Sequence, residues 1–373
     1  MPPAIGEIES VKIAIAHDWL NQIGGAENVL EVMVSMFPEA PVFTTIYAPD
    51  LMPPVYRQWP IQTSWLDRAP GIHRHHQPYL PLYPLAVRSL DLSEYDLIIS
   101  NKSGFIHGIQ TTENQQHLCY CLAPTRYVWN YQAYASREQM GPAARLMLIP
   151  MIAVLRRWDY LAAQRVDQFC AISTDIQNRI SQAYHRESSI IPPPVDTERF
   201  QPVSNPRADY YYILSRMIPY KRLDLAIKAC NRLEKRLIIT GEGRHLRSLQ
   251  AMAGPTIEFT GRLPWTEVTE LMANCKAFIF PGYEDFGISP VEAQAAGRPV
   301  IAFAAGGALD TIIDNETGVF FQQQTVDSVI DAIERLEKMH FDPQKIRQNA
   351  ERFGIARFKT ALQAWIQQAV SAS

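Results

Sequence analysis

The sequence alternates short apolar runs with segments of helical periodicity, and this alternation occurs twice along its 373 residues. In the first half, the runs that predict buried strands cover residues 11–16, 42–45, 97–100, 118–121 and 169–172. In the second half, they begin at Tyr210 and continue at 237–240, 256–260, 277–280 and 299–302. Helices are expected after Gly25, Pro142 and Thr174. Because such alternation typically builds parallel sheets covered by helices, the expected fold class is α/β with two domains.

A proline-rich stretch marks the domain boundary. Residues 191–206 contain repeated prolines, which remove backbone donors and stiffen a connection. We therefore expect an N-terminal domain over residues 1–193 and a C-terminal domain over 207–352, with further helices beginning near Asp342. Each domain is long enough to bury its own core, at about 150–200 residues. The proline-rich region 51–93 is expected to be irregular and to lie on the surface, where it is a candidate for shaping an acceptor site.

Composition excludes several classes of protein. The apolar fraction of 47% and the charged fraction of 20% are typical of a soluble globular protein, and a net charge of −3 disfavours a nucleic-acid binder. Five cysteines without CxxC spacing predict reduced thiols and a cytoplasmic location, and residues 1–10 show no leader peptide. No segment is apolar enough to span a membrane. The apolar run 146–155 has arginines on both sides, so it predicts either a buried helix or a helix resting on an anionic membrane surface.

Two glutamates, Glu284 and Glu292, lie eight residues apart around a predicted helix start. The strand 277–280 leads into a turn, and a helix is expected with Ser289 as its N-cap and Pro290 at its first position. A diphosphate over this helix start would meet free amides from Phe286, Gly287, Ile288 and Ser289 together with the positive end of the helix dipole. Carboxylates accept hydrogen bonds from the hydroxyls of a sugar or a ribose. The pattern therefore predicts a site for a nucleotide sugar, while a pair of solvated surface acids is the simpler alternative.

Two cations, Arg216 and Lys221, follow the strand that begins at Tyr210 and precede a helix. They are expected at the carboxyl edge of a sheet, where open α/β folds bind ligands. Two cations there can neutralise a leaving diphosphate, although isolated surface charges would give the same spacing. No Asp-x-Asp triplet occurs, so no metal ion is expected on the donor and no cofactor is needed.

The combination of Arg216 and Lys221, the Glu284 to Glu292 element and the early loop Gly24-Gly25-Ala26-Glu27 resembles the retaining glycosyltransferases of family 4. The resemblance covers nearly the whole chain. It implies the GT-B fold, in which two Rossmann-like domains face each other across a deep interdomain cleft and the helix over residues 353–373 packs back on the first domain. The segment 120–130 is similar to the bacterial mannosyltransferase branch that builds polysaccharides and O-antigens.

The resemblance also implies roles for particular residues. Asp18, Gly24 and Gly25 match positions that approach the donor phosphate and the transferred sugar. Arg262 and Leu263 match a loop that borders the nucleobase. The donor is expected to be GDP-mannose or a UDP-sugar, and the acceptor a glycan or a lipid-linked hydroxyl, with a peripheral contact at the inner face of the membrane left open.

The remaining expectations concern the reaction and the acceptor. Arg216, Lys221 and the amides near Gly287 would stabilise the leaving group, Glu284 would orient the sugar and Glu292 would hold the ribose. Since no nucleophile stands out, a same-face attack is favoured. Trp129, with Arg126 and Tyr127, is a candidate acceptor platform because aromatic faces pack against sugar rings.

One departure from the family leaves alternatives open. This branch usually has a histidine before Thr-Pro, where the present chain has Leu122 and Ala123. His107 is either a polar group from a neighbouring loop or a packed histidine. A non-catalytic protein that binds sugar nucleotides is the second hypothesis. An NAD-dependent oxidoreductase is the third, although Gly241-Glu242-Gly243 lacks the third glycine of a dinucleotide fingerprint.

Overall fold

The structure is a computed structural model that describes residues 11–131, 141–207 and 209–371, without the side chains of residues 142–145. The expectation of no leader peptide concerns residues 1–10, which lie outside these ranges. The chain divides into two compact units. Unit 1 runs to Pro192 and includes Lys359–Ser373, and unit 2 is Pro193–Phe358. The division falls in the proline-rich stretch.

Unit 1 is built on a parallel sheet that, among the described residues, has seven strands in the order β3-β2-β1-β4-β5-β6-β7. The strands are β1 (Ile13–His17), β2 (Val42–Thr44), β3 (Ile61–Thr63), β4 (Leu97–Lys102), β5 (Gln116–Cys121), β6 (Gln168–Ala171) and β7 (Ser188–Ile190). The α-helices are α1 (Gly25–Met36), α2 (Tyr83–Arg88), α3 (Arg126–Trp129), α5 (Pro142–Ala163), α6 (Thr174–Tyr184) and most of α14 (Ile355–Ser371). The helices expected after Gly25, Pro142 and Thr174 are confirmed.

Unit 2 repeats the design with six strands among its described residues, in the order β10-β9-β8-β11-β12-β13 and all parallel. The strands are β8 (Tyr211–Leu214), β9 (Leu237–Thr240), β10 (Ile257–Gly261), β11 (Ala277–Phe280), β12 (Val300–Phe303) and β13 (Gly318–Phe321). The α-helices are α7 (Leu223–Arg232), α8 (Leu246–Gln250), α9 (Trp265–Asn274), α10 (Ile288–Ala295), α11 (Ala308–Thr311), α12 (Val326–Glu337) and α13 (Pro343–Glu351). This strand order is that of doubly wound, Rossmann-like sheets, so the expected fold class is confirmed.

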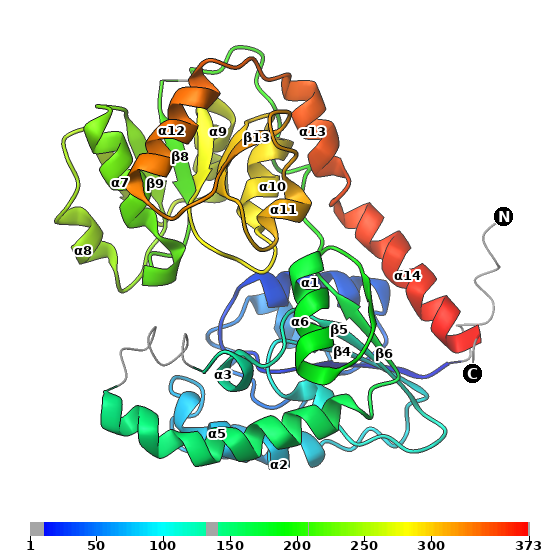
Figure 1. Cartoon of the computed structure of the whole chain (residues 1–373). Helices are drawn as coiled ribbons and strands as arrows, with labels where there is room; N and C mark the ends of the chain where they lie inside the picture. The colour runs from blue at the N-terminus through cyan, green and yellow to red at the C-terminus, as the bar shows by residue number, and fades with distance from the viewer. Residues whose placement is uncertain (1–10, 132–140, 208, 372–373) are drawn as a thin grey trace. The chain divides into compact units, whose positions relative to one another are not determined.

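Apolar periodicity explains how these elements pack. Every residue of β9 and β11 is buried, as expected for strands covered by helices on both faces. In Figure 1, α7 and α12 lie side by side in unit 2, where their apolar residues join one core cluster with β8 and β9. Cys119 and Cys121 are buried free thiols in unit 1, as the sequence indicates.

The structure corrects the sequence in three regions. Region 51–93 is not irregular: it holds β3, α2 and the 3-10 helices η2 (Pro54–Gln58), η3 (Trp65–Arg68) and η4 (Gln77–Leu82). Strands β7 and β13 were also not predicted from the sequence. Strands β3, β7 and β13 all lie at sheet edges. Strands β3 and β7 carry polar residues with a single apolar side chain each, so these two lack the apolar run of a central strand. In the part of the chain that the structure describes, no helix has both the length and the apolarity to cross a membrane.

Candidate functional site

Each sheet has a point where the strand order reverses, between β1 and β4 in unit 1 and between β8 and β11 in unit 2. The loops that follow these strands run in opposite directions, which leaves a crevice at the carboxyl edge of the sheet. In unit 2 a small cavity lies at this point, lined by residues of β8, β11 and the loops after them, including Ser215, Lys221 and Glu284. The reversal point therefore holds two of the predicted site residues.

Lys221 and Glu284 contact each other directly in this crevice. The Lys221 ammonium donates a hydrogen bond to the Glu284 carboxylate, and the side chains are 13% and 20% exposed. They lie 63 residues apart in sequence but meet because β8 and β11 are neighbours. This confirms neither role, but it shows that the two motifs form one cluster. The pair leaves the cation partly accessible and held in a fixed position.

A run of small residues after β12 shapes the turn that carries Glu284, and sequence reasoning missed it. The Gly307 amide donates to the Glu284 carbonyl at 2.9 Å. A β-carbon on Gly306 would lie 2.3 Å from that carbonyl oxygen, and one on Gly307 would lie 2.2 Å from the Phe286 α-carbon. Since both neighbours are backbone, larger residues would push the turn away. The signal in the sequence is the Gly306-Gly307 pair directly after a buried strand.

The loop with Arg216 is held in a similar way by the loop after β9, residues 241–243. The amide of Met217 donates to the Glu242 carbonyl at 2.8 Å. A β-carbon on Gly241 would lie 2.1 Å from the Ser215 carbonyl oxygen, and one on Gly243 would lie 2.3 Å from that of Met217. The two glycines are therefore required for loop packing. Arg216 itself is exposed beside this loop.

The predicted nucleobase loop follows β10, on the far side of β9 from β8. The amide of Gly241 donates to the Gly261 carbonyl at 2.8 Å, so the loops after β9 and β10 are in contact. Arg262 is exposed and Leu263 is half-buried. Three strand spacings separate β10 from β11, about 14 Å. The carboxyl edge of unit 2 therefore presents predicted site residues along a line long enough for an extended ligand.

The helix after Glu284 begins earlier than the sequence predicts. Helix α10 starts at Ile288 with Gly287 as its N-cap, so the prediction of Ser289 as N-cap and Pro290 as first residue is wrong. Gly287 has φ 92°, a left-handed conformation that favours glycine. Pro290 is tolerated as the third helical residue because the amide it lacks has no partner within the helix there. Phe286 is 4% exposed and anchors the turn.

Glu292 is a buried carboxyl group on α10, 9% exposed. Burial raises its pKa to about 7, and the nearby Asp196 adds to this effect, while Arg199 opposes it. Arg199 is an ion-pair partner of Asp196 at 2.8 Å and lies over the Trp265 ring. The Glu292 carboxyl group therefore titrates near neutral pH, and a hydroxyl or cation brought by a ligand would shift its ionisation.

This pKa makes the stability of the protein depend on pH. A carboxyl group whose folded-state pKa is raised stabilises the fold below its unfolded pKa, and this contribution is lost as pH rises through the folded pKa. From 4.5 to about 7, the loss corresponds to about 3 kcal/mol. Glu292→Gln should therefore unfold at higher urea than the parent at pH 8 but not at pH 4.5. The surface variant Glu334→Gln should follow the parent at both pH values, and an equal response of both variants would contradict this assignment.

In unit 1 the reversal point is occupied by Asp18, which is 1% exposed. Its carboxylate accepts hydrogen bonds from the amides of Ser103 (2.6 Å), Gly104 (2.6 Å) and Ile106 (2.8 Å). These bonds occupy both oxygens. Asp18 therefore fixes the turn after β4, and the catalytic contact with the donor sugar that the resemblance implies for it stays a prediction.

That turn leads to His107, which is fully buried and not open to a ligand. It lies in the 3-10 helix η5 (Ile106–Gly108), and its Nε2 is 3.2 Å from the Asp159 carbonyl oxygen. Burial and the nearby Lys102 lower its pKa to about 4, so it is neutral at pH 7. Of the two alternatives that the sequence leaves open, the structure shows the packed histidine.

Asp159, on α5, is the centre of a buried network that sequence reasoning missed. Its carboxylate accepts hydrogen bonds from the Thr125 hydroxyl (2.6 Å), the Trp129 indole N–H (2.7 Å) and the Tyr184 hydroxyl (2.8 Å). The ammonium group of the buried Lys102 donates to the same Thr125 hydroxyl at 3.2 Å. Buried polar groups of this kind need all their partners. The network ties the segment between β5 and α3 to the sheet and to α5.

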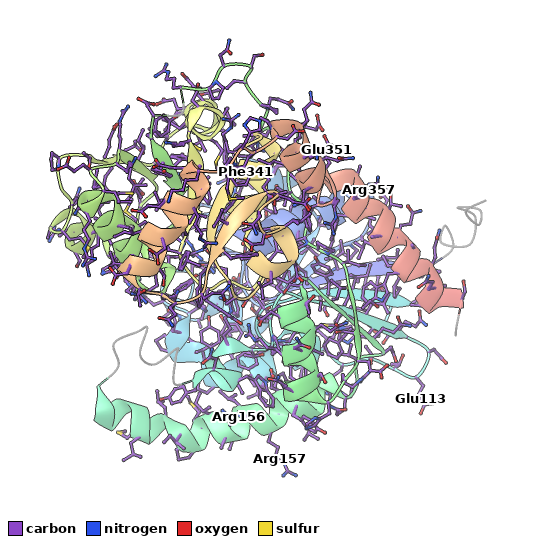
Figure 2. All side chains as sticks on the ribbon, turned by 45° about the horizontal axis from the view of Figure 1, so that its top comes forward. Glu113, Arg156, Arg157, Phe341, Glu351 and Arg357 are labelled. Carbon is purple, nitrogen blue, oxygen red and sulfur yellow. The ribbon has the colours of Figure 1, made fainter. Side chains whose placement is uncertain are left out.

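Replacing Asp159 should therefore destabilise unit 1. Asp159→Asn keeps the volume of the side chain but removes the charge and turns one oxygen into a donor that faces other donors. We expect a loss of about 2–4 kcal/mol in the free energy of unfolding, since bonds to buried charged groups contribute the most. Urea unfolding followed by circular dichroism measures this. Glu113→Gln at the surface (Figure 2) is the matched control, and an unchanged midpoint for Asp159→Asn would contradict the network's importance.

The predicted acceptor platform lies on α3, held by this network. Arg126 is exposed, and Tyr127 and Trp129 are half-buried. The indole N–H of Trp129 is engaged by Asp159, so the ring is fixed in orientation. Leu122 and Ala123, which stand where the family has its histidine and threonine, are buried, and the Ala123 carbonyl accepts from Lys102 at 3.0 Å.

Gly24 and Gly25 open helix α1. Gly24 is its N-cap, and a β-carbon there would lie 3.3 Å from the carboxylate of the buried Glu27. Glu27 in turn lies 3.5 Å from Nε2 of the buried His17. The Asn101 amide donates to the Ala26 carbonyl at 2.8 Å. The glycines therefore keep the start of α1 close to the carboxyl end of β1.

Two Rossmann-like units, one with a lysine–glutamate pair at its strand-order reversal, place the chain among the doubly wound α/β proteins. Residues 194–353, nearly all of unit 2, match the family model described as "Glycosyl transferases group 1". Unit 2 is thus a group 1 glycosyl transferase domain, which confirms the resemblance seen in the sequence.

Curated relatives point the same way. The chain is 31% identical over 225 residues to the GDP-mannose-dependent alpha-(1-6)-phosphatidylinositol monomannoside mannosyltransferase of Mycolicibacterium smegmatis, covering 52% of this chain and 57% of the relative. It is also 31% identical over 215 residues to the protein of that name from Mycobacterium tuberculosis, covering 49% and 55%. The matched part thus spans about half the length of these relatives.

Solved structures share the fold over nearly the whole chain. Sucrose-phosphate synthase from Thermosynechococcus elongatus superposes with a TM-score of 0.72 at 19% identity, covering 96% of this chain and 100% of that one. Anabaena HepE in complex with UDP and glucose gives 0.68 at 18% identity, covering 96% and 99%. At these identities the likeness establishes the GT-B fold and nothing finer.

Proposed function

We propose that this protein is a retaining glycosyltransferase that moves a hexose, mannose as the leading choice, from a nucleoside diphosphate sugar to a hydroxyl of a glycan or lipid-linked acceptor. The observation that carries the proposal is the Lys221–Glu284 pair at the strand-order reversal of a group 1 glycosyl transferase domain. The relatives named for GDP-mannose support mannose and guanine, and the HepE complex with UDP keeps a UDP-sugar as the second candidate.

Unit 2 is proposed to hold the donor along its carboxyl edge. Lys221, Arg216 and the first amides of α10 would neutralise the diphosphate, because that helix start offers free N–H groups and a positive dipole end. Glu284 would fix Lys221 and accept from a sugar hydroxyl. The ribose would bond Glu292, and the base would lie near Arg262 and Leu263.

In the proposed reaction, the bond between the anomeric carbon and the diphosphate oxygen breaks while the acceptor oxygen attacks the same face of the sugar. The acceptor's proton passes to the departing phosphate oxygen, so no protein nucleophile is needed. Lys221 and Arg216 stabilise the negative charge that develops on the leaving diphosphate. We assign this charge stabilisation to protein groups in place of a metal ion. We also propose that the reaction takes place on the cytoplasmic side of the membrane.

Unit 1 is proposed to bind the acceptor. Trp129 offers a ring of fixed orientation against which a sugar can pack, and Arg126 is exposed beside it. Asp159 holds the segment that carries Trp129, and Asp18 holds the turn after β4. Gly24 and Gly25 leave room for the transferred sugar at the start of α1.

A binding and turnover screen tests the function. The purified chain is mixed with GDP-mannose, UDP-glucose, UDP-galactose or NAD in the presence of EDTA, and melting shifts and slow donor hydrolysis are recorded. We expect stabilisation and hydrolysis with GDP-mannose. Stabilisation by a sugar nucleotide without any turnover, even with a glycan acceptor mixture, would favour the non-catalytic binding protein that Leu122 and Ala123 suggest. Stabilisation by NAD alone would indicate an oxidoreductase. The packing of Gly241 and Gly243 against protein carbonyls argues against that function, because these glycines then serve the packing of the loop and not the approach of a dinucleotide.

A further inference from the structure

Helix α5 is apolar on two opposite faces. One face packs into unit 1 through Ile152, Leu155 and Ala162, which are at most 7% exposed. The other side bears large apolar side chains that are mostly uncovered: Leu146 (69% exposed), Met147 (79%), Ile149 (52%), Val154 (69%) and Leu161 (50%). In Figure 1 this helix runs along the outside of unit 1 next to α3.

The exposed apolar residues follow helical spacing. Leu146, Pro150, Val154 and Leu161 recur at intervals of four, four and seven residues, so they form one stripe opposite the packed face. A surface helix normally carries polar residues there, and a contiguous apolar stripe marks an interaction surface. We call Leu146, Met147, Pro150, Val154, Arg157 and Leu161 the outer stripe.

The charge of this surface selects its partner. Arg157 lies in the stripe, and Figure 2 shows it pointing away from the body of unit 1. Its neighbour Arg156 turns inward and donates to the Val128 carbonyl at 2.7 Å. The only acidic residue between 142 and 163 is Asp159, which is buried. The outer stripe therefore combines apolar side chains with positive charge and carries no negative charge of its own.

We propose that the outer stripe docks unit 1 on an anionic lipid bilayer, with α5 lying in the plane of the interface. The helix has 22 residues, about 33 Å long, and its other face is committed to the core, so the outer stripe alone enters the lipid. Apolar side chains reach the acyl boundary, while Arg157 extends to lipid phosphates. This deepens the proposed function, because the Trp129 platform is bonded to the inner side of the same helix through Asp159, where a lipid-linked acceptor would be presented.

Vesicle sedimentation with the full chain tests the docking. The vesicles are phosphatidylcholine alone or with about 30% phosphatidylglycerol, enough to give an anionic surface. We expect binding to the anionic vesicles and at least about tenfold weaker partitioning for Met147→Glu/Val154→Glu. Arg157→Ala should weaken it by about fivefold, and Arg157→Lys should restore it. Val55→Glu, which places a charge at another exposed apolar position of unit 1, should bind like the parent.

The outcomes separate this proposal from its competitors. Melting shifts with GDP-mannose should be the same for the parent and the double variant, so a failure of the docking proposal does not depend on the donor site. Equal vesicle binding of parent and double variant would overturn the proposal. So would a dimer in light scattering that the double variant dissociates, because a second copy would then cover the stripe.

Discussion

Lys221→Ala should lower kcat by about 100- to 1000-fold while weakening donor binding much less, as expected when a preorganised charge that stabilises the leaving group is removed. The reason lies in the geometry of unit 2. Lys221 is held by Glu284 at the reversal point and is mostly buried. Its electrostatic interaction with the leaving diphosphate is therefore stronger than it would be in water. The measurement is steady-state transfer or donor hydrolysis with the donor identified in the screen.

Two further variants make this result specific. Lys228→Ala removes an exposed lysine from α7 in the same unit and should leave kcat unchanged. In Lys221→Ala the Glu284 carboxylate stays behind and repels the diphosphate, so Lys221→Ala/Glu284→Gln should bind donor more tightly than the single variant. A kcat within about threefold of the parent for Lys221→Ala would refute the proposed role.

Gly307→Ala should nearly abolish donor binding and also destabilise unit 2. The added methyl group would sit 2.2 Å from the Phe286 α-carbon, and the nearest atoms are all backbone. The Glu284 turn must then shift, which costs about 1–3 kcal/mol in stability and removes the Gly307–Glu284 hydrogen bond that aligns the site. Calorimetric titration with GDP or GDP-mannose and a melting curve measure the two effects.

The control for this variant is Gly141→Ala. An added β-carbon there meets no atom of the described residues within 4 Å, so the variant should melt and bind donor like the parent. If Gly307→Ala kept the parent's donor affinity, the turn would tolerate a displacement that the site as described does not allow.

The sequence predicted the central strands well because their signal is local. β9 (Leu-Ile-Ile-Thr) and β11 (Ala-Phe-Ile-Phe) are short, largely apolar runs followed by Gly241 and Pro281, and both were predicted with their observed bounds. The edge strands β3 and β7 carry little apolar content, and their existence depends on pairing with a neighbour far away in sequence. The N-cap at Ser289 was predicted from residue preferences, but the left-handed Gly287 and the buried Phe286 fix the helix start instead.

For the candidate site, the sequence indicated the groups that carry charge but not those that hold them in place. Lys221 and Glu284 were recognisable because each follows a buried strand. Their contact required the strand order, which no local pattern encodes. Lys102 and Asp159 were missed because a charged residue is usually a surface residue, and only the fold shows that they bond within the core.

The proposal that donor diphosphate binds at the strand-order reversal of unit 2 is tested most directly by hydrogen exchange with the full chain, in EDTA, with and without saturating GDP. Amides in 215–222, 284–292 and 304–308 should exchange more slowly with nucleotide, and Gly307→Ala, which is expected to lose donor binding, should lose that protection. Saturable binding of GDP that leaves these three segments unchanged and protects others would contradict the account.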